Sequence, residues 1–221
     1  MQRVLEPELM IDPQQTAAYA DADFSVGHQG IVDALAKRFS DFDFTSACLD
    51  LGCGPLDVSV RLLEKFREMT VHGVDGSEPM LELGRRELVK RGLQTRMSLL
   101  NQRLPALTLP QESYSLIFSS SLLHHLHNPS DLWTVVKKAS KPSTRVYIAD
   151  LYRPETPEAA RAMVERYTPN EPEILKLDFF NSLLAAFSLE EVNIQLEEAG
   201  LSDRLAIDIL TDRHMVISGI L

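Results

Sequence analysis

The sequence predicts an α/β fold: a doubly wound, mostly parallel sheet of seven strands with one antiparallel strand in a C-terminal hairpin, plus a helical cover. Short apolar runs alternate with helical patterns from residue 47 to residue 150, as in a parallel sheet with helices on both faces. A glycine-rich turn follows the first run. One amphipathic helix and two adjacent strand-like runs close the chain, which indicates the hairpin.

The expected strands are short runs enriched in apolar residues, most of them bounded by polar residues, glycine or proline. They lie at residues 47–51, 71–75, 96–100, 114–119, 145–150, 205–210 and 214–221. We expect the third run to be short or to lie toward an edge of the sheet.

The helix expected from about Glu78 to Arg91 is marked at both ends. Ser77 is a good N-cap residue, and Pro79 falls in the first turn, where a missing N–H does no harm. Gly92 suits the residue that ends a helix. These signals together define the helix between the second and third strands.

Two later helices carry weaker signals. Ser130 is expected to cap a helix that ends at Pro142. Ser188 and Glu191 form a capping box for a helix that stops at Gly200.

The chain is expected to form a single domain over residues 1–221. An N-terminal helical segment, 1–40, and an insert, 151–187, are expected to form a cover over the active site. The insert breaks the strand–helix rhythm with four prolines and short helical pieces. A mobile loop is the alternative for this insert.

Composition limits the classes of partner. The formal net charge is −10 and the pI is about 5.1, so a phosphate-binding basic face is disfavoured, and with it a nucleic-acid partner. No run approaches the ~18 apolar residues of a membrane span, and the first residues lack the apolar core of a signal peptide. We therefore expect a cytoplasmic protein without a membrane partner. Its oligomeric state stays open between monomer and homodimer.

The two cysteines, Cys48 and Cys53, flank the first strand and its turn. A disulfide between them would deform the turn, so reduced thiols are expected. Two thiols without clustered histidines make no zinc site, and no metal is expected.

The candidate ligand site lies at the end of the first strand, in the segment Asp50-Leu51-Gly52-Cys53-Gly54-Pro55. Its glycines allow positive φ and a close approach of the backbone to a ligand, and the next helix offers free N–H groups. Asp75 ends the second strand about 20 residues later, where an acidic residue can accept both hydroxyls of a ribose. Together the two features predict an adenosine-containing ligand.

Asp57 discriminates between two adenosine-containing ligands, NAD and S-adenosylmethionine. The dinucleotide fingerprint has Gly or Ala three residues after its second glycine, which is the position of Asp57 here. A carboxylate at that point would repel a pyrophosphate. It is compatible with S-adenosylmethionine (SAM), which has no phosphate and carries a cationic ammonium and sulfonium. The sequence therefore favours SAM over NAD.

Residues 49–55 resemble the first motif of the class I SAM-dependent methyltransferases, and residues 73–77 with Met80 and Leu81 resemble the second. The resemblance covers 47–150 well and 187–221 moderately. It implies an enzyme that transfers the methyl group of SAM. The cofactor-binding residues that it implies or that we expect are Tyr19, Asp50, Gly52, Cys53, Gly54, Asp75, Gly76, Ser77, Met80, Asn101, Gln102 and Ser119.

The resemblance also assigns roles to these positions. Asp50 and the backbone of the glycine turn would surround the methionine portion, and Asp75 would bind the ribose with Gly76 and Ser77 beside it. Met80 would lie against adenine. Ser119, at the end of the fourth strand, would face the methionyl end.

Several positions depart from the family pattern, among them Ser115, which stands where an aspartate is common. Leu56 stands where a third glycine is common. Asn101 and Gln102 stand where many members have an acidic residue that contacts the adenine amino group, and an amide oxygen of either could accept that bond. Tyr19 belongs to a segment that related enzymes often fold over SAM. We expect it to close the pocket, with helix packing on the sheet as the alternative.

The methyl transfer implied by the resemblance is an in-line displacement at a sulfonium, so the protein mainly aligns the partners and excludes water. A protonated acceptor also needs a base. His124 and His125 follow the fourth strand and are the candidate catalytic residues, with a purely structural role as the alternative. A small-molecule acceptor is the first hypothesis. An RNA or protein acceptor, and a SAM-binding enzyme that transfers no methyl, are its rivals.

Overall fold

The computed structural model describes residues 1–110 and 113–221, and its centre is a seven-stranded sheet. The strands are β1 (Ala47–Leu51), β2 (Thr70–Asp75), β3 (Met97–Asn101), β4 (Tyr114–Ser120), β5 (Ser140–Leu151), β6 (Leu205–Ile209) and β7 (His214–Ile220). Their order is β3-β2-β1-β4-β5-β7-β6. β7 runs antiparallel to β5 and β6, and the other pairs are parallel. This confirms the predicted sheet and places the third strand at an edge.

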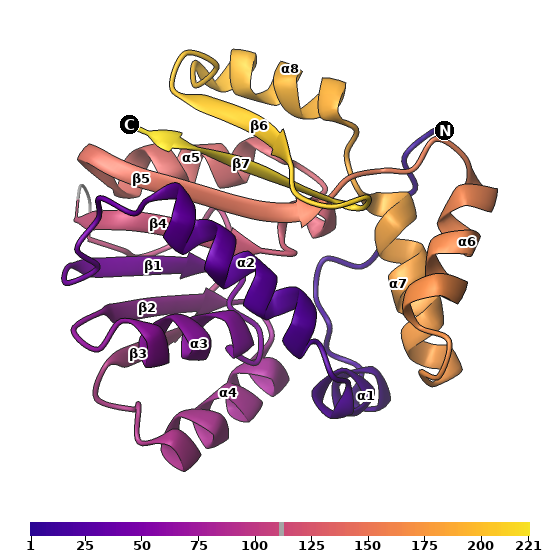
Figure 1. Ribbon diagram of the computed structural model, residues 1–221, viewed down its shortest axis with the longest axis horizontal. Helices are drawn as coiled ribbons and strands as arrows, with labels where there is room; N and C mark the ends of the chain where they lie inside the picture. The colour runs from indigo at the N-terminus through magenta and orange to yellow at the C-terminus, as the bar shows by residue number, and fades with distance from the viewer. Residues whose placement is uncertain (111–112) are drawn as a thin grey trace.

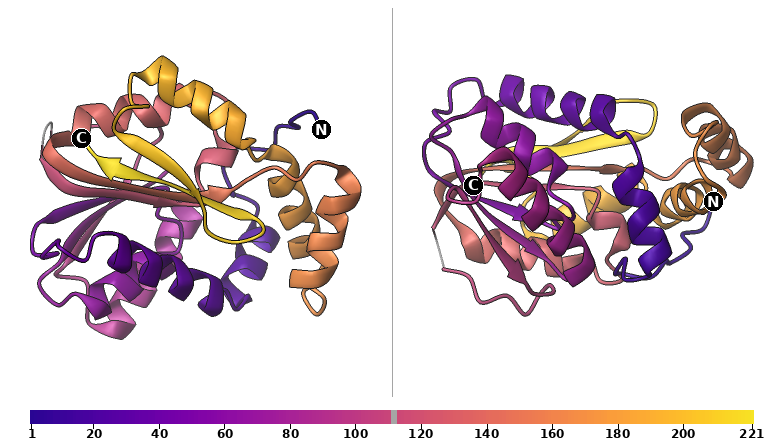
Figure 2. Two further views of the ribbon diagram at one scale, coloured as in Figure 1. Left: turned by 45° about the horizontal axis from the view of Figure 1, so that its top comes forward. Right: turned by 90° about the horizontal axis from the view of Figure 1, so that it is seen from below.

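The helices lie on both faces of the sheet and beyond one of its ends. They are α1 (Pro13–Asp21), α2 (Ser25–Arg38), α3 (Asp57–Lys65), α4 (Glu78–Arg91), the 3₁₀ turn η1 (Leu123–His125), α5 (Ser130–Ala139), α6 (Pro157–Tyr167), α7 (Glu173–Ala185) and α8 (Leu189–Ala199). Helices α2, α3 and α4 cover one face, and α5 and α8 cover the other (Figures 1 and 2). Helices α1, α6 and α7 lie on the side toward which the parallel strands point (Figure 1).

Neighbouring residues of each central strand enter different cores, because side chains alternate between the two faces of a sheet. Cys48 and Leu116 pack toward α2, α3 and α4. Leu49 and Ile117 pack toward α5 and α8. Since both faces are covered, these strands read as continuous apolar runs rather than as alternating ones. Both cysteines are buried free thiols.

Helix-end signals identified most boundaries well. Helix α4 has the predicted bounds, with the Ser77 hydroxyl accepting a hydrogen bond from an N–H of its first turn and Gly92 in the left-handed conformation. The capping box that opens α8 is also present. The expectation for Ser130 was wrong: Pro129 is the N-cap residue, and Ser130 is the first residue of α5.

Strand β5 begins at Ser140, earlier than the expected start at residue 145, and α5 ends at Ala139 rather than at Pro142. Contacts far along the chain extend the strand. The Thr144 hydroxyl donates to Tyr114 O (2.6 Å), and Leu221 N donates to Thr144 O (2.9 Å). The C-terminal residue therefore helps to hold this part of β5 extended.

The segment 151–187 contains two helices, α6 and α7, in place of the loop that was the alternative. They enclose a small core of their own, made of Leu151, Ala160, Val164, Leu183 and Ala186. The N-terminal segment is helical only from Pro13 onward, so the expectation of helix was wrong for its first twelve residues. Within the described residues, no helix combines the length and apolarity that crossing a membrane requires.

Candidate active site

The turn after β1 combines two left-handed glycines with hydrogen bonds to β2. Gly52 has φ +70° and Gly54 has φ +51°. The N–H groups of Gly52 and Cys53 donate to Val74 O at 2.8 and 3.0 Å. These bonds hold the turn against the end of β2, next to the β1–β4 boundary where the order of the strands reverses and where such sheets bind ligands.

Leu56, which replaces a common glycine, keeps the backbone conformation of a glycine. Its φ is +75°, and it is the N-cap residue of α3. Its buried side chain packs against Gly84 of α4, where any Cβ would come within 2.5 Å of Leu56 Cγ. Gly84 has no side chain, and this leaves room on α4 for the side chain of Leu56.

Asp75 joins the two sequence motifs in one hydrogen-bonded unit. Its Oδ2 accepts from Gly54 N (2.8 Å), and its Oδ1 accepts from Ser77 N (2.7 Å). Burial raises the pKa of Asp75, although these two bonds oppose the rise. An ionised carboxylate has about four lone-pair sites, so each oxygen can accept a further hydrogen bond. The geometry fits a carboxylate that receives two vicinal hydroxyls of a ribose.

Asp50, one residue before the end of β1, is only 3% exposed. Burial raises the pKa of Asp50 to about 7, even though Ser59 Oγ donates to its Oδ2 at 2.6 Å. A cation nearby would favour the ionised form and lower this pKa. The residue therefore suits a place beside a positively charged part of a ligand.

Tyr19 lies near the end of α1, a helix that packs against α4 and α7. Its ring packs against Phe24 with centroids 4.7 Å apart. Burial raises the pKa of Tyr19 to about 12, and the nearby carboxylates of Asp57 and Asp75 add to this. The Tyr19 hydroxyl is thus within electrostatic reach of the carboxylates that open α3 and end β2, and its role in closing the pocket stays a prediction.

The carboxylate of Asp57 interacts with basic side chains of the protein itself. His28 Nδ1 lies 2.6 Å from its Oδ2, and Arg61 Nε lies 2.9 Å from the same atom. Although burial raises it, the bonds from His28 and Arg61 lower the pKa of Asp57 to about 2. Two basic side chains therefore balance the carboxylate that opens α3.

On the expected adenine side, Met80 is buried and the Ser77 hydroxyl donates to Met10 O at 2.6 Å. The side chain of Leu9 covers Gly76, where an added Cβ would lie 2.6 Å from Leu9 Cδ2. Leu9 and Met10 were not predicted, because residues 1–12 show no periodicity that would place them.

Three further predicted residues make contacts within the protein. Asn101 Nδ2 donates to Glu78 Oε2 (2.9 Å), and Gln102 Oε1 accepts from Thr108 N (2.8 Å). Buried Ser119 donates its hydroxyl to Leu51 O (2.6 Å) and so ties the end of β4 to the end of β1. Their assignment to the cofactor stays a prediction.

The two histidines after β4 meet two carboxylates that sequence analysis did not identify. His124 is 3% exposed, and its Nδ1 lies 2.6 Å from Asp150 Oδ1. Leu123 N donates to Asp150 Oδ2. On the other side, Glu6 Oε1 lies 3.5 Å from His124 Nε2 and 3.1 Å from His125 Nδ1. Burial lowers the pKa of His124, but the charges of Asp150 and Glu6 outweigh burial and raise it.

The position of Asp150 could have been predicted from the sequence. An acidic residue at the end of an apolar strand falls on the ligand edge of the sheet. Glu6 has no such signal. It belongs to a segment that we call the N-terminal strap, residues 3–10, which runs across η1 toward Asp75.

Arg3 anchors the start of the strap. Its Nη2 donates to His124 O (2.8 Å) and Leu126 O (3.0 Å), and its guanidinium lies 3.7 Å from the ring centroid of Phe187. Farther along, Glu8 accepts from His127 N (3.1 Å). The strap is therefore held by charged and backbone contacts at several points along the ligand edge.

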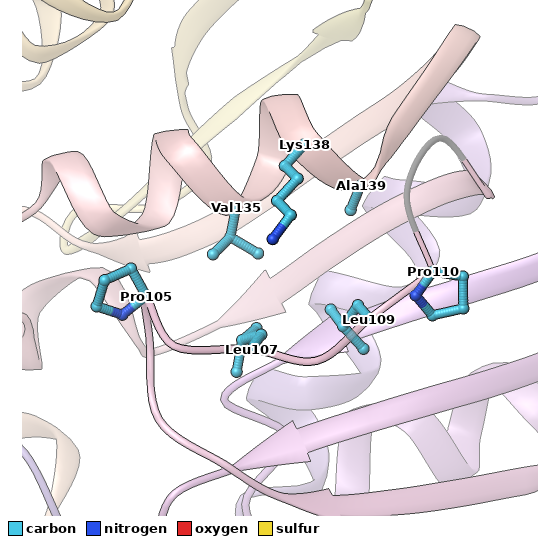
Figure 3. A pocket seen from close by; sticks show the side chains of 7 residues that line it. All are labelled: Pro105, Leu107, Leu109, Pro110, Val135, Lys138 and Ala139. Atoms are coloured by element: carbon cyan, nitrogen blue, oxygen red, sulfur yellow. The ribbon is translucent and has the colours of Figure 1, made fainter.

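A separate hollow lies between α5 and the segment that joins β3 to β4 (Figure 3). It is lined by Pro105, Leu107, Leu109, Pro110, Val135, Lys138 and Ala139. Among the described lining residues Lys138 is the only charged one, and none is a carboxylate, imidazole or thiol. The hollow therefore offers no acid–base group pair, and the candidate active site is the carboxyl edge of the sheet.

Comparison with known proteins finds related methyltransferases. Residues 48–143 match the family model of a methyltransferase domain. The chain is 30% identical over 124 residues to the malonyl-acyl-carrier-protein O-methyltransferase of Priestia megaterium, a match that covers 56% of this chain and 41% of that protein. The chain thus spans about two fifths of the length of this curated relative.

Solved structures share the fold over nearly the whole chain. A SAM-dependent methyltransferase from Aquifex aeolicus has a TM-score of 0.68 at 19% identity, over 96% of this chain and 99% of that one. A protein from Methanococcus maripaludis assigned to the S-adenosyl-L-methionine-dependent methyltransferases has a TM-score of 0.73 at 19% identity, over 98% and 96%. The likeness in fold therefore extends beyond the residues that the family model covers.

Proposed function

We propose that this chain is a class I SAM-dependent methyltransferase and that it transfers the methyl group of SAM to a small-molecule acceptor; the match of residues 48–143 to a methyltransferase-domain model supports this. The observation that carries the proposal is the position of Asp75. Its two oxygens accept from Gly54 N and Ser77 N, so both motifs converge on one carboxylate at the ligand edge. This geometry supports a site for the ribose of an adenosyl ligand.

SAM supplies a methyl group on a positively charged sulfur. The residues of this chain bind it, orient it and exclude water. Asp75 would hold the ribose, the turn at Gly52–Gly54 would admit the methionine portion, and Asp50 would lie beside its cationic part. Tyr19 and the strap would close the edge over the ligand.

Two features support a small acceptor over RNA or a folded protein. The net charge of −10 disfavours a polyanion. Helices α1, α6 and α7 lie beyond the ligand edge of the sheet, where they would limit the access of a large acceptor (Figure 1). His124 and His125, next to this edge, remain our candidates for the residues that meet the acceptor.

The test is incubation of the purified chain with SAM and a cell extract separated into small-molecule, RNA and protein fractions. We expect S-adenosylhomocysteine to form only with the small-molecule fraction, together with a metabolite that gains one methyl by mass spectrometry. Product formed only with RNA or protein would contradict the small acceptor. SAM binding without any S-adenosylhomocysteine would contradict methyl transfer itself.

The burial of Asp50 predicts a pH dependence of cofactor binding. Without ligand, Asp50 keeps its proton below its pKa of about 7. The methionyl ammonium favours the ionised form, so binding at lower pH requires release of that proton. Affinity for S-adenosylhomocysteine, which retains the ammonium, should fall as pH drops from about 8 to 6, approaching about tenfold per unit well below the pKa.

Calorimetry of wild type and Asp50→Asn over this range measures the effect. The neutral amide should bind more weakly at high pH and with a flatter pH profile. Ser59→Ala is the companion variant: it removes the hydrogen bond that stabilises the carboxylate and should move the inflection to higher pH. Parallel profiles for wild type and Asp50→Asn would show that Asp50 does not interact with the ammonium.

A further inference from the structure

Glu6, His124 and His125 place three metal-ligand atoms together at the end of β4, all within 4.8 Å of one another. They are the one such group among the described residues. We propose that these side chains form a binding site for a divalent transition-metal ion of the zinc type, which favours imidazole and carboxylate ligands. The proposal rests on the geometry of this cluster and does not depend on the proposed function.

The two separations from the Glu6 carboxylate agree with a tetrahedral site. Zinc lies at about 2.0–2.2 Å from nitrogen and oxygen ligands, so two ligand atoms at the tetrahedral angle are about 3.3 Å apart. The distances from Glu6 Oε1 are 3.1 Å to His125 Nδ1 and 3.5 Å to His124 Nε2. These two values lie on either side of the ideal. The third pair, Nε2 of His124 and Nδ1 of His125, lies within 4.8 Å, and the two rings would adjust to bring it to the tetrahedral separation.

His124 is oriented as metal-binding histidines usually are. Its Nδ1 lies 2.6 Å from Asp150 Oδ1, and an N–H there leaves Nε2 with a lone pair directed toward Glu6. A carboxylate behind a histidine fixes the tautomer and raises the basicity of the ligand nitrogen. Asp150 is itself held by Leu123 N at 2.7 Å, so the orientation is set by the end of β5.

His125 supplies an independent observation. Its Nδ1 is buried and has no hydrogen-bond partner among the described residues, although Glu6 Oε1 is 3.1 Å away. Buried polar atoms without partners are rare and need an explanation. In a metal site the ligand atoms face a common point rather than one another, so a close contact without hydrogen-bond geometry is expected there.

The rival arrangement is a protonated His124 between Glu6 and Asp150 without an ion. It would satisfy His124, but it leaves Nδ1 of His125 without a hydrogen bond, 3.1 Å from Glu6 Oε1. A metal ion would provide a partner for Nε2 of His124 and for Nδ1 of His125. The proposed site also revises the expectation that the chain binds no metal. That expectation rested on the two cysteines, and the sequence alone could not place Glu6 beside the histidines.

The site would join the strap to the end of β4. Glu6 comes from the strap and both histidines from η1. Three protein ligands leave a fourth position for water or for an oxygen of a ligand, as in catalytic zinc sites. The histidines would then act as ligands of the ion rather than as general bases.

The test uses Co²⁺ and Zn²⁺ alone, added to the full chain after treatment with a chelator. We expect one Co²⁺ per chain, with the visible absorption of a tetrahedral nitrogen–oxygen site, and a rise in Tm with Zn²⁺. Glu6→Gln and His125→Gln should each weaken binding by more than about tenfold. Tm without metal shows whether each variant is folded.

Matched controls come from the same elements. Glu8→Gln changes the other glutamate of the strap at the ligand edge, and His127→Gln changes a histidine just beyond η1. Both should bind Co²⁺ like wild type. No Co²⁺ absorption in wild type, or equal binding by Glu6→Gln and Glu8→Gln, would overturn the proposal.

Failure of this inference and failure of the proposed function are distinguishable. Metal binding should persist in Asp75→Ala while binding of S-adenosylhomocysteine is weakened by about 100-fold. A chain that forms S-adenosylhomocysteine but binds no metal refutes the metal site alone.

Discussion

Replacing Asp75 by alanine is expected to weaken SAM binding by about 100-fold. Hydrogen bonds to a charged acceptor contribute about 1.5–3 kcal/mol each, and loss of about 3 kcal/mol corresponds to about 100-fold in Kd. Asp75 is the expected acceptor for two ribose hydroxyls, and the turn at Gly54 depends on it as well. Calorimetry with SAM and with S-adenosylhomocysteine measures the loss.

The same change leaves Gly54 N and Ser77 N without their acceptor, so a second variant separates folding from binding. Asp75→Asn keeps one oxygen acceptor and the shape of the side chain, and it should be more stable than Asp75→Ala while still binding weakly. Asp208→Ala, on the exposed edge strand β6, controls for the loss of one negative charge. A folded Asp75→Ala that binds SAM as tightly as wild type would be incompatible with the proposed site.

Replacing Gly52 by alanine is expected to destabilise the fold by about 2–5 kcal/mol and to abolish SAM binding. Part of the cost is the left-handed backbone, about 1–2 kcal/mol for a residue with a Cβ. The rest is overlap: the new Cβ would lie 2.8 Å from Leu122 Cδ1 and 2.9 Å from Leu122 Cβ, and overpacking costs about 1–3 kcal/mol. Urea unfolding measures the stability, and calorimetry measures the binding.

Gly92→Ala isolates the backbone contribution. Gly92 has φ +69°, almost the same as Gly52, but an added Cβ meets no atom within 4 Å. The Gly92→Ala variant should lose only the free energy of unfolding that the left-handed backbone costs, about 1–2 kcal/mol. It should keep SAM binding. The double variant Gly52→Ala/Leu122→Ala should recover part of the loss at Gly52. Equal destabilisation at Gly52 and Gly92 would show that Leu122 does not restrict the turn.

The elements that sequence analysis identified best are those whose signals are local. Strand β1 has the predicted bounds 47–51, and α4 has the predicted bounds 78–91. An N-cap serine, a C-terminal glycine and an apolar run act on their own neighbours in the chain. The errors came where distant contacts decide: β5 starts early because Thr144 pairs with Tyr114 and with the C-terminus.

The same division holds within the candidate site. Gly52, Gly54 and Asp75 were found from spacing, because the end of a parallel strand and the next turn always meet the ligand edge. The partners of Asp57 were not found, since His28 lies on a different helix and reaches Asp57 only after folding.

By itself, the sequence determined the seven-stranded α/β fold, the glycine turn and the acidic residue after β2. Hydrophobic period, caps and turn chemistry depend on residues that are close in the chain, and they are readable without the fold. Only the tertiary structure brought Glu6 of the strap and Asp150 of β5 to opposite sides of His124. No local pattern connects these residues, because their contact depends on how the strap crosses the sheet edge and on the order of the strands.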